Sequence, residues 1–193
     1  LGLQRHGYTA YFHAGQKRTK VSQGVGLVVA QRHVANVAEE LPATDTGGRS
    51  ITIDIKMLNT EWWRFTSAYG VPNPASGRQQ EAAALLDHLS AVGLEATVRG
   101  MKHAILTDAN SVSDVGADAL NSNSWDPTGL VVRLMEAGFE DAFRVAGHDG
   151  VAWSFRTMYE GRAVYRRLDY ILLNTSAAGD VVRASIDHTK KPG

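Results

Sequence analysis

Short apolar segments separated by polar loops run through most of the chain, and they predict strands. Each segment is rich in β-branched, aliphatic or aromatic residues and is bounded by residues that favour turns. Gly24–Ala30 is apolar throughout, which predicts burial on both faces, whereas Ser50–Met57 alternates strictly and should be half exposed. The predicted strands are Tyr8–Phe12, Gly24–Ala30, Ser50–Met57, Arg64–Tyr69, His103–Thr107, Val151–Phe155, Leu168–Leu173 and Val181–Ile186.

The apolar period changes to that of a helix in two places. After Gly77, one helical face is formed by Ala82, Leu85, Leu86, Leu89 and Val92. Gly93 should end this helix. A second helix is expected to begin at Asp126, with the acid as N-cap and Pro127 in the first helical position, and to end at Gly138.

These elements predict one layered α/β domain that covers residues 1–193, with its chemistry in the loops at strand ends. Strands dominate, and the polar stretches 39–49 and 111–125 are predicted loops. At 193 residues, with 44% hydrophobic residues, the chain is long enough for one sizeable core and short for two.

Composition excludes several classes of function. The lack of cysteine excludes disulfides, thiolate metal sites and a cysteine nucleophile. No apolar run approaches the roughly 18 to 20 residues that a membrane span requires, and the first residues do not resemble a secretory signal. We therefore expect no membrane association and an intracellular location, with the nucleus as one alternative. The formal net charge is zero, so there is no overall electrostatic attraction to nucleic acid.

Polar residues suited to phosphodiester hydrolysis follow several predicted strands. Asp108 and Asn110 come directly after a buried strand, and in an extended chain residues two apart share one side. A carboxylate and an amide that converge there can hold a metal-bound phosphate or the water that attacks it. The alternative is a plain turn, because Asp and Asn favour strand exits for backbone reasons.

A second group combines carboxylates with a histidine. Asp169 lies between apolar residues of a predicted strand, and Asp187-His188 follows another. A carboxylate in such surroundings is costly unless it is paired. A histidine is a natural partner, because the carboxylate fixes its tautomer and stabilises its charged form, so that it can act as general base or stabilise charge on phosphate. The alternative is an ion pair of Asp169 with Arg166 or Arg167 at a sheet edge.

Tyr69 ends a predicted strand and is followed by a proline turn that contains Asn73. Tyr69 can donate to a phosphate oxygen, Asn73 can contact the substrate backbone, and Arg78 can pair with phosphate. The alternatives are a half-buried core tyrosine, a plain turn, and an arginine that opens the helix.

Taken in chain order, these segments resemble the endonuclease/exonuclease/phosphatase superfamily of magnesium-dependent phosphoesterases. The matching motifs are Gly24-Val25-Gly26, Tyr69-Gly70-Val71-Pro72-Asn73, Thr107-Asp108-Ala109-Asn110, Arg167-Leu168-Asp169-Tyr170 and Ile186-Asp187-His188. Two further segments also resemble family motifs: Gly138-Phe139-Glu140-Asp141-Ala142-Phe143-Arg144 and Trp153-Ser154-Phe155.

The resemblance implies a four-layered sandwich, in which two mixed β-sheets pack face to face with flanking helices. It also implies residue roles. His188 would lie at the phosphate, supported by Asp169. Asp108 would position or deprotonate the attacking water, Asn110 would hold that water or the phosphate, and Tyr69 would be a phenol on the phosphate side.

The implied cofactor is Mg²⁺, with Mn²⁺ as an alternative, and Asp187 would lie near this metal. Thr107 replaces the family's glycine before Asp108, and Ile186 replaces the serine before Asp187. The family's first strand, with an Asn near the metal, and the next segment, with a metal-ligating Glu, should precede Leu1. The chain is therefore expected to be a piece of a longer protein, and its activity is expected to depend on these groups.

The long loop after Asn110 and the Gly-Phe-x-Asp-x-x-Arg segment are most similar to a retroelement endonuclease domain. That resemblance implies a DNA endonuclease that nicks one strand, with a reverse transcriptase domain downstream in the same polyprotein. A net charge of zero gives little electrostatic support for DNA as the substrate. A phosphatase or a sphingomyelinase-like phosphoesterase is therefore a second alternative. A non-catalytic remnant that binds nucleic acid or a protein is the third alternative, although the retained Asp108, Asn110, Asp169 and His188 argue against it.

Overall fold

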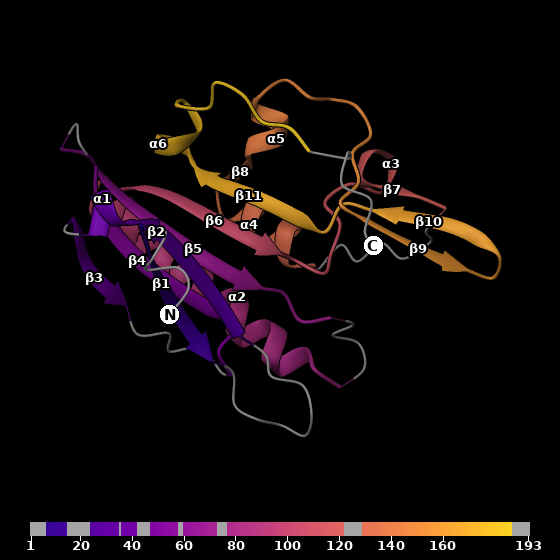
Figure 1. Ribbon diagram of the computed structural model, residues 1–193. Helices are drawn as coiled ribbons and strands as arrows, with labels where there is room; N and C mark the ends of the chain where they lie inside the picture. Colours follow the sequence, from indigo (N-terminus) through magenta and orange to yellow (C-terminus); the bar gives the residue numbers. More distant parts are fainter. Residues whose placement is uncertain are drawn as a thin grey trace.

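The centre of the computed structural model is a mixed sheet of six strands in the order β3-β4-β5-β6-β11-β8 (Figure 1). The model describes residues 7–14, 24–34, 36–41, 47–57, 60–72, 77–121 and 129–186. The six strands are β3 (Val37–Leu41), β4 (Ser50–Lys56), β5 (Trp62–Tyr69), β6 (Lys102–Asp108), β8 (Phe139–Asp141) and β11 (Asp169–Asn174). Strands β5 and β6 are parallel, and the other neighbours are antiparallel.

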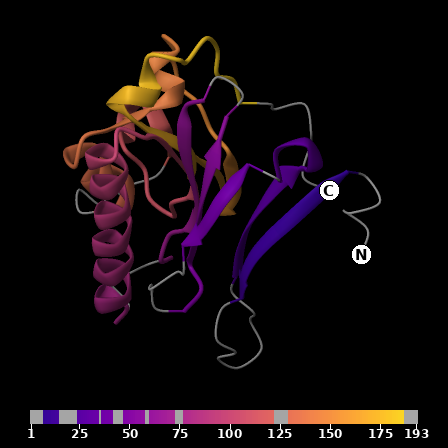
Figure 2. The ribbon, with the colours of Figure 1, turned by 90° about the vertical axis from the view of Figure 1, so that its left-hand side faces the viewer.

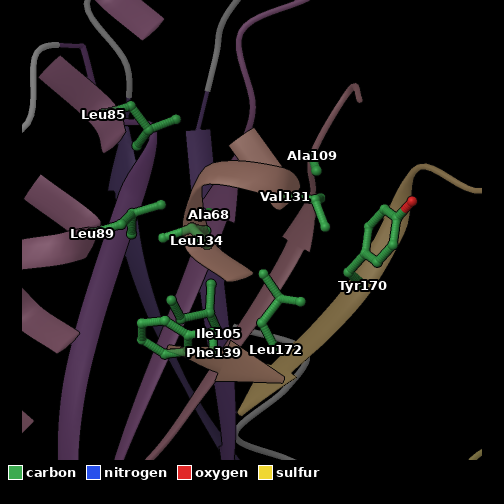
Figure 3. Packing of buried hydrophobic residues seen from close by; sticks show 10 residues of the cluster. All are labelled: Ala68, Leu85, Leu89, Ile105, Ala109, Val131, Leu134, Phe139, Tyr170 and Leu172. Atoms are coloured by element: carbon green, nitrogen blue, oxygen red, sulfur yellow. The ribbon is translucent and has the colours of Figure 1, made fainter. Parts of the chain in front are cut away.

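Helices α2 (Gln79–Val98) and α4 (Leu130–Glu136) cover one face of this sheet. The long helix α2 is the crossover that a parallel pair such as β5 and β6 requires. Its Leu85 and Leu89 pack with Val131 and Leu134 of α4 on the sheet residues Ala68, Ile105, Phe139, Tyr170 and Leu172 (Figure 3). This is the largest apolar core of the described residues.

A two-stranded antiparallel sheet, β1 (Tyr8–Ala14) and β2 (Gly24–Ala30), packs on the opposite face. Val29 of β2 contacts Ile53 and Ile55 of β4. The short helix α1 (Gln31–Val34) follows β2, while α5 (Ala142–Val145) and α6 (Thr175–Ala178) pack on the same face of the large sheet. Figure 2 shows the three layers edge-on, with α2 on one side and β1–β2 on the other.

A third sheet extends away from the body of the molecule (Figure 1). It has the order β7-β10-β9 and is formed by β7 (Ala119–Leu120), β9 (Phe155–Tyr159) and β10 (Arg162–Arg166). The one-turn helix α3 (Val115–Asp118) leads into it. Both residues of the β9–β10 turn have positive φ, 48° at Glu160 and 76° at Gly161, as in a type I′ hairpin turn.

The fold class is α/β, as the sequence predicts, and most predicted strands are present. Two mixed sheets face to face are not what the described residues form, because the sheet that faces the six-stranded one is an antiparallel pair. The mixed α/β fold is therefore confirmed, and the four-layered sandwich stays a prediction.

Several predicted elements differ from the structure. Val151–Phe155 becomes a strand only at Phe155, and Val181–Ile186 is irregular. Part of the expected loop 39–49 belongs to β3, and the expected loop 111–125 contains α3 and β7. The second helix begins at Leu130, and the predicted start at Asp126-Pro127 lies outside the described residues.

Gly93 does not end α2 as predicted, because it serves packing inside the helix. A Cβ atom at this position would lie 2.7 Å from the ring of Phe139. Gly93 therefore lets the helix approach β8, and that contact outweighs its low helix propensity. The helix continues to Val98 and is followed by Gly100, which has a positive φ of 66°.

The two burial predictions are wrong for one reason. Strand β4 is buried from Ser50 to Ile55, since β1–β2 covers one face while α2 covers the other. Strand β2 was expected to be buried on both faces, but Val28 is 53% exposed because β2 lies in an outer layer. The alternation of apolar and polar residues predicts which residues share a face of the strand. Whether that face is exposed to water depends on the layers that pack against it.

Candidate functional site

Three residues that the sequence singles out form a row across adjacent strand ends. The register pairs Tyr69 of β5 with Asp108 of β6, and Asp108 with Asp169 of β11. Side chains on a strand alternate between faces, so all three lie on the sheet face that also carries Phe65 and Ala104. Residues far apart in sequence thus meet at one edge of the sheet.

The Asp108 and Asp169 carboxyls come from a pair of residues whose side chains lie close together. Ala109 N donates to Leu168 O at 2.7 Å, while Gly70 N donates to Asp108 O at 2.7 Å on the other side of β6. Asp108 and Asp169 are therefore a non-hydrogen-bonded antiparallel pair, the type with the shorter spacing.

This placement changes the proton affinity of Asp108. Burial raises the pKa of the Asp108 carboxyl, the negative charge of Asp169 raises it further, and the Asn110 N–H group that it accepts from opposes both. A carboxyl with a raised pKa beside a second carboxyl is a frequent feature of sites that transfer protons.

Asn110 does not share a side with Asp108 in an extended chain, as the sequence analysis expects, because it lies in the left-handed region at φ 51°. Its N–H group donates to Asp108 Oδ1 at 3.2 Å, and its Nδ2 donates to Gly70 O at 3.0 Å. The turn offered as the alternative is therefore present, and asparagine tolerates its backbone geometry. The amide group ties the end of β6 to the end of β5.

Gly70 is required by how closely these two ends approach. A Cβ atom at this position would lie 2.0 Å from Ala109 O, so no other residue fits without moving the backbone. Its amide and carbonyl groups both bond the β6 end, through Asp108 O and Asn110 Nδ2. The Tyr69-Gly70 segment and the Asp108–Asn110 segment form one locked unit.

Arg78 and Arg49 meet on one carboxylate beside this unit. Arg78 is the N-cap residue of α2 and donates from Nε to Glu81 Oε2 at 2.8 Å. Arg49 is fully buried and donates from Nε to Glu81 Oε1 at 2.6 Å. The hydrogen bond from Arg78 lowers the pKa of Glu81 against the opposing effect of burial, and Arg49 lowers it further. Arg78 thus opens the helix, which is the alternative that the sequence analysis allows.

Sequence reasoning missed Arg49, which it placed at the end of a loop. Arg49 Nη1 donates to Tyr69 O at 3.3 Å and to Gly70 O at 3.4 Å, and its guanidinium lies 5.4 Å from the centre of the Tyr69 ring. No local pattern marks it. It could have been found only from the pairing of β4 with β5, which places it beside Tyr69.

Asp169 is exposed, and the backbone that presents it is held by Ser154. The N–H groups of Leu168 and Asp169 donate to Ser154 Oγ at 3.0 and 3.1 Å. Ser154 belongs to the Trp153-Ser154-Phe155 motif but was not among the predicted site residues.

Arg167 is not the partner of Asp169, because its guanidinium is bound elsewhere. It donates to Asp118 and Asp141, which are both buried. Arg144 donates to the same Asp118 at 2.6 Å. Burial alone would lower the pKa of Arg167, but the two carboxylates hold it above its ordinary value. This buried network of Asp118, Asp141, Arg144 and Arg167 fixes the segment from which Asp169 projects.

Three predicted site residues, Asn73, Asp187 and His188, lie outside the described residues. The segment that leads to the last two is anchored by His148, whose Nε2 lies 2.7 Å from Ala184 O and whose ring stacks on Phe143. The predicted contact of Asp169 with His188 therefore stays a prediction.

A metal site is not complete in the part of the chain that the structure describes, where no group of three or more His, Asp and Glu side chains could hold an ion. Asp108 and Asp169 alone meet at the strand ends. Mg²⁺ is often held by one or two carboxylates together with substrate phosphate and water. Two neighbouring carboxylates suit that ion in charge and hardness, but they do not define its site.

Comparison with known proteins identifies the fold. Neither the protein-family models nor the curated proteins give a match to the sequence. Solved structures do match. The catalytic domain of APE2 from Xenopus laevis has a TM-score of 0.66 at 18% identity, over 90% of this chain and 68% of that one. The chain is therefore similar in fold to solved structures of the endonuclease/exonuclease/phosphatase superfamily.

Two other structures extend this likeness. The 3′ phosphatase NExo from Neisseria, solved with a product DNA hairpin, has a TM-score of 0.61 at 20% identity, over 92% of this chain and 71% of that one. The endonuclease domain of TRAS1, a telomere-specific non-LTR retrotransposon, has a TM-score of 0.58 at 15% identity, over 88% of this chain and 68% of that one. At such identities the likeness extends to the fold alone. None of the helices in the described ranges is long and apolar enough to cross a membrane.

Proposed function

We propose that the chain is a Mg²⁺-dependent phosphodiester hydrolase that nicks DNA. The observation that carries this proposal is the row of Tyr69, Asp108 and Asp169 at one sheet edge, with the Asp108 pKa raised. The fold that holds this row is also that of a 3′ phosphatase and of a retrotransposon endonuclease.

In the proposed reaction, Asp108 accepts a proton from the water that attacks the phosphorus atom. As the new P–O bond forms, the P–O bond to the leaving sugar oxygen breaks, and that oxygen takes a proton from solvent. The raised pKa of Asp108 brings it nearer to neutral pH, where a base is effective but still ionised. Asn110 keeps the Asp108 carboxyl in place through its backbone N–H group. Tyr69 donates to a phosphate oxygen, and Asp169 fixes the tautomer of His188, which stabilises the developing negative charge. Asp187 would help to hold Mg²⁺, which when bound would supply charge neutralisation at the phosphate.

A nucleic acid substrate is supported by the β9–β10 hairpin, which begins and ends at the site. Ser154 immediately precedes it, and Arg167-Leu168-Asp169 follow it. All five residues of β9 are exposed, with Met158 at 61% and Tyr159 at 66%. From Phe155 to Arg166 the hairpin contains three arginines and one glutamate, so it is positive although the whole chain is neutral. Arginines bind phosphates, and exposed aromatic rings stack on bases.

We further propose that the parent protein is a retroelement polyprotein with a reverse transcriptase downstream, acting in the nucleus. The residue pattern supports this, and the TRAS1 domain is one of several matching structures. The sequence of the gene beyond this segment tests it. A downstream reverse transcriptase is expected, and a different enzyme domain there would contradict it.

The test of the proposed activity is nicking of supercoiled plasmid, with Mg²⁺ or with EDTA, by the complete domain, expressed together with the preceding segment that is expected to carry the Asn and the metal-ligating Glu. Nicking is expected with Mg²⁺ only, and Asp108→Asn should slow it at least about 100-fold, because loss of a general base typically costs that much. Asp87→Asn removes an exposed carboxylate of α2 as a matched control and should leave nicking unchanged. Undiminished nicking by Asp108→Asn would contradict the assignment of the base.

The same preparation separates the alternatives. Hydrolysis of a 3′-phosphorylated oligonucleotide, an inositol phosphate or sphingomyelin without nicking would favour another phosphoesterase, an alternative that the match to a 3′ phosphatase supports. DNA binding without hydrolysis of any of these substrates would favour the non-catalytic remnant.

A further inference from the structure

A chain of contacts links helix α2 to the Asp108 carboxyl. Glu81 in the first turn of α2 accepts from Arg49 Nε, and Arg49 Nη1 donates to Gly70 O. Gly70 O also accepts from Asn110 Nδ2, and Asn110 N donates to Asp108 Oδ1. The first three contacts each join two different segments, and the last lies within the Asp108–Asn110 segment. The chain thus connects α2, the start of β4, the end of β5 and the end of β6.

The geometry gives Arg49 little freedom. Its side chain is fully buried, Glu81 and the Tyr69 and Gly70 carbonyls accept from it, and its guanidinium faces the Tyr69 ring. Arg78 holds the other oxygen of Glu81, which fixes the orientation of that carboxylate. A planar guanidinium suits this position because it donates in several fixed directions, which an ammonium group on a flexible stem does not reproduce.

We propose that Arg49, oriented by Glu81, is a positioning residue that sets the Asp108 carboxyl for proton transfer through Gly70 and Asn110. It touches neither substrate nor metal in this role. The proposal rests on the proposed hydrolysis for its kinetic consequences, but its structural consequence is independent of any activity.

The consequence follows from the groups that act on Asp108. The Asn110 N–H group opposes burial and the charge of Asp169, which both raise the Asp108 pKa. If Arg49 is lost, Gly70 and Asn110 shift, and the Asn110 N–H bond to Asp108 Oδ1 weakens. The Asp108 pKa should then rise further. Arg49→Lys keeps the positive charge, so it changes the geometry of the contacts while conserving most of the direct electrostatic attraction.

The experiment is a ¹³C NMR titration of the carboxyl groups in the wild type, Arg49→Lys and Glu81→Gln, with the Asp108 signal assigned by Asp108→Asn. The Asp108 pKa should rise in both variants, more in Arg49→Lys. If Arg49→Lys does not fold, the milder Glu81→Gln decides. Arg64→Lys is the matched control, because Arg64 is another fully buried arginine, bound to Asp54, on the same strand pair. It should lower stability without moving the Asp108 pKa.

Kinetics supply the second readout. In Arg49→Lys, kcat should fall about 10-fold with KM unchanged, and the acid limb of the pH–rate profile should move to higher pH with the Asp108 pKa. An unchanged Asp108 pKa in both variants, or an equal rise in Arg64→Lys, would overturn the positioning role. If the complete wild-type domain hydrolyses no phosphodiester, the proposed function fails, while the titration still decides the role of Arg49.

Discussion

Asp108 shows at the scale of one residue how this fold places a reactive group at a cost in stability. The carboxyl is half-buried beside Asp169, and this partial burial is the main cause of its raised pKa. A raised pKa means that the folded state disfavours the ionised form. The same placement that suits Asp108 to accept a proton therefore destabilises the fold at neutral pH.

Asp108→Asn should accordingly unfold at a higher temperature than the wild type at pH 7. Asn keeps an oxygen that accepts from the Asn110 N–H group, but it carries no charge. The pH dependence follows from the coupling of protonation to folding. A carboxyl whose pKa is raised in the folded state stabilises the fold when it is protonated, and this stabilisation is lost as pH rises through the folded-state pKa. The gain of the variant should thus disappear below the ordinary pKa of aspartate.

Thermal unfolding of both proteins between pH 3 and pH 8 measures this difference, with Asp87→Asn as the exposed control. A lower melting temperature for Asp108→Asn at pH 7 would show that the Asp108 charge is stabilised by its surroundings. The raised pKa would then be wrong.

At the scale of elements, the β9–β10 hairpin was not predicted from the sequence, although it carries the arginines of the proposed DNA contact. A strand was predicted at Val151–Phe155, but residues 151–154 are irregular and the hairpin begins at Phe155. The hairpin is defined by its turn, in which Glu160 and Gly161 both have positive φ, and by the antiparallel pairing of β9 with β10. An exposed strand paired on one side carries no burial pattern to detect.

The double variant Arg156→Ala with Arg162→Ala should weaken DNA binding without preventing folding, because both side chains are exposed. Each arginine that contacts a phosphate contributes about one to the slope of log affinity against log salt concentration, so the slope should fall by up to about two. Fluorescence anisotropy with a labelled duplex at several salt concentrations measures it.

Arg133→Ala with Arg99→Ala removes two exposed arginines from helix α4 and from the end of α2, and serves as the control. An equal loss of slope in both double variants would mean that the hairpin has no special role in binding.

At the scale of the whole molecule, the network of Asp118, Asp141, Arg144 and Arg167 joins four segments by ion pairs. It links α3, the end of β8, α5 and the start of β11. Tyr170 adds to it by donating its hydroxyl to Arg167 O, with its ring 4.2 Å from the Arg167 guanidinium. These segments lead into the β9–β10 hairpin and into Asp169. The network therefore fixes the position of both relative to the six-stranded sheet.

Asp118→Asn should lower the free energy of unfolding by about 3–5 kcal/mol, because it leaves the buried Arg167 and the nearby Arg144 without a full counter-charge. Urea unfolding followed by circular dichroism measures this change. Asp149→Asn, at an exposed position, should change it by less than about 0.5 kcal/mol. A loss for Asp118→Asn no larger than that of the control would mean that the network contributes no net stability.

The sequence by itself determined most strands, the start of the long helix, the α/β class and the residues with reactive groups. Hydrophobic period and turn residues act over a few neighbouring positions, so they can be read locally. Tertiary structure decided that both faces of β4 are buried and that Gly93 lies inside a helix against Phe139. It also decided that Tyr69, Asp108 and Asp169 form a row with Arg49 beside Tyr69. Register and layer packing depend on residues far apart in the chain, and no local pattern encodes them.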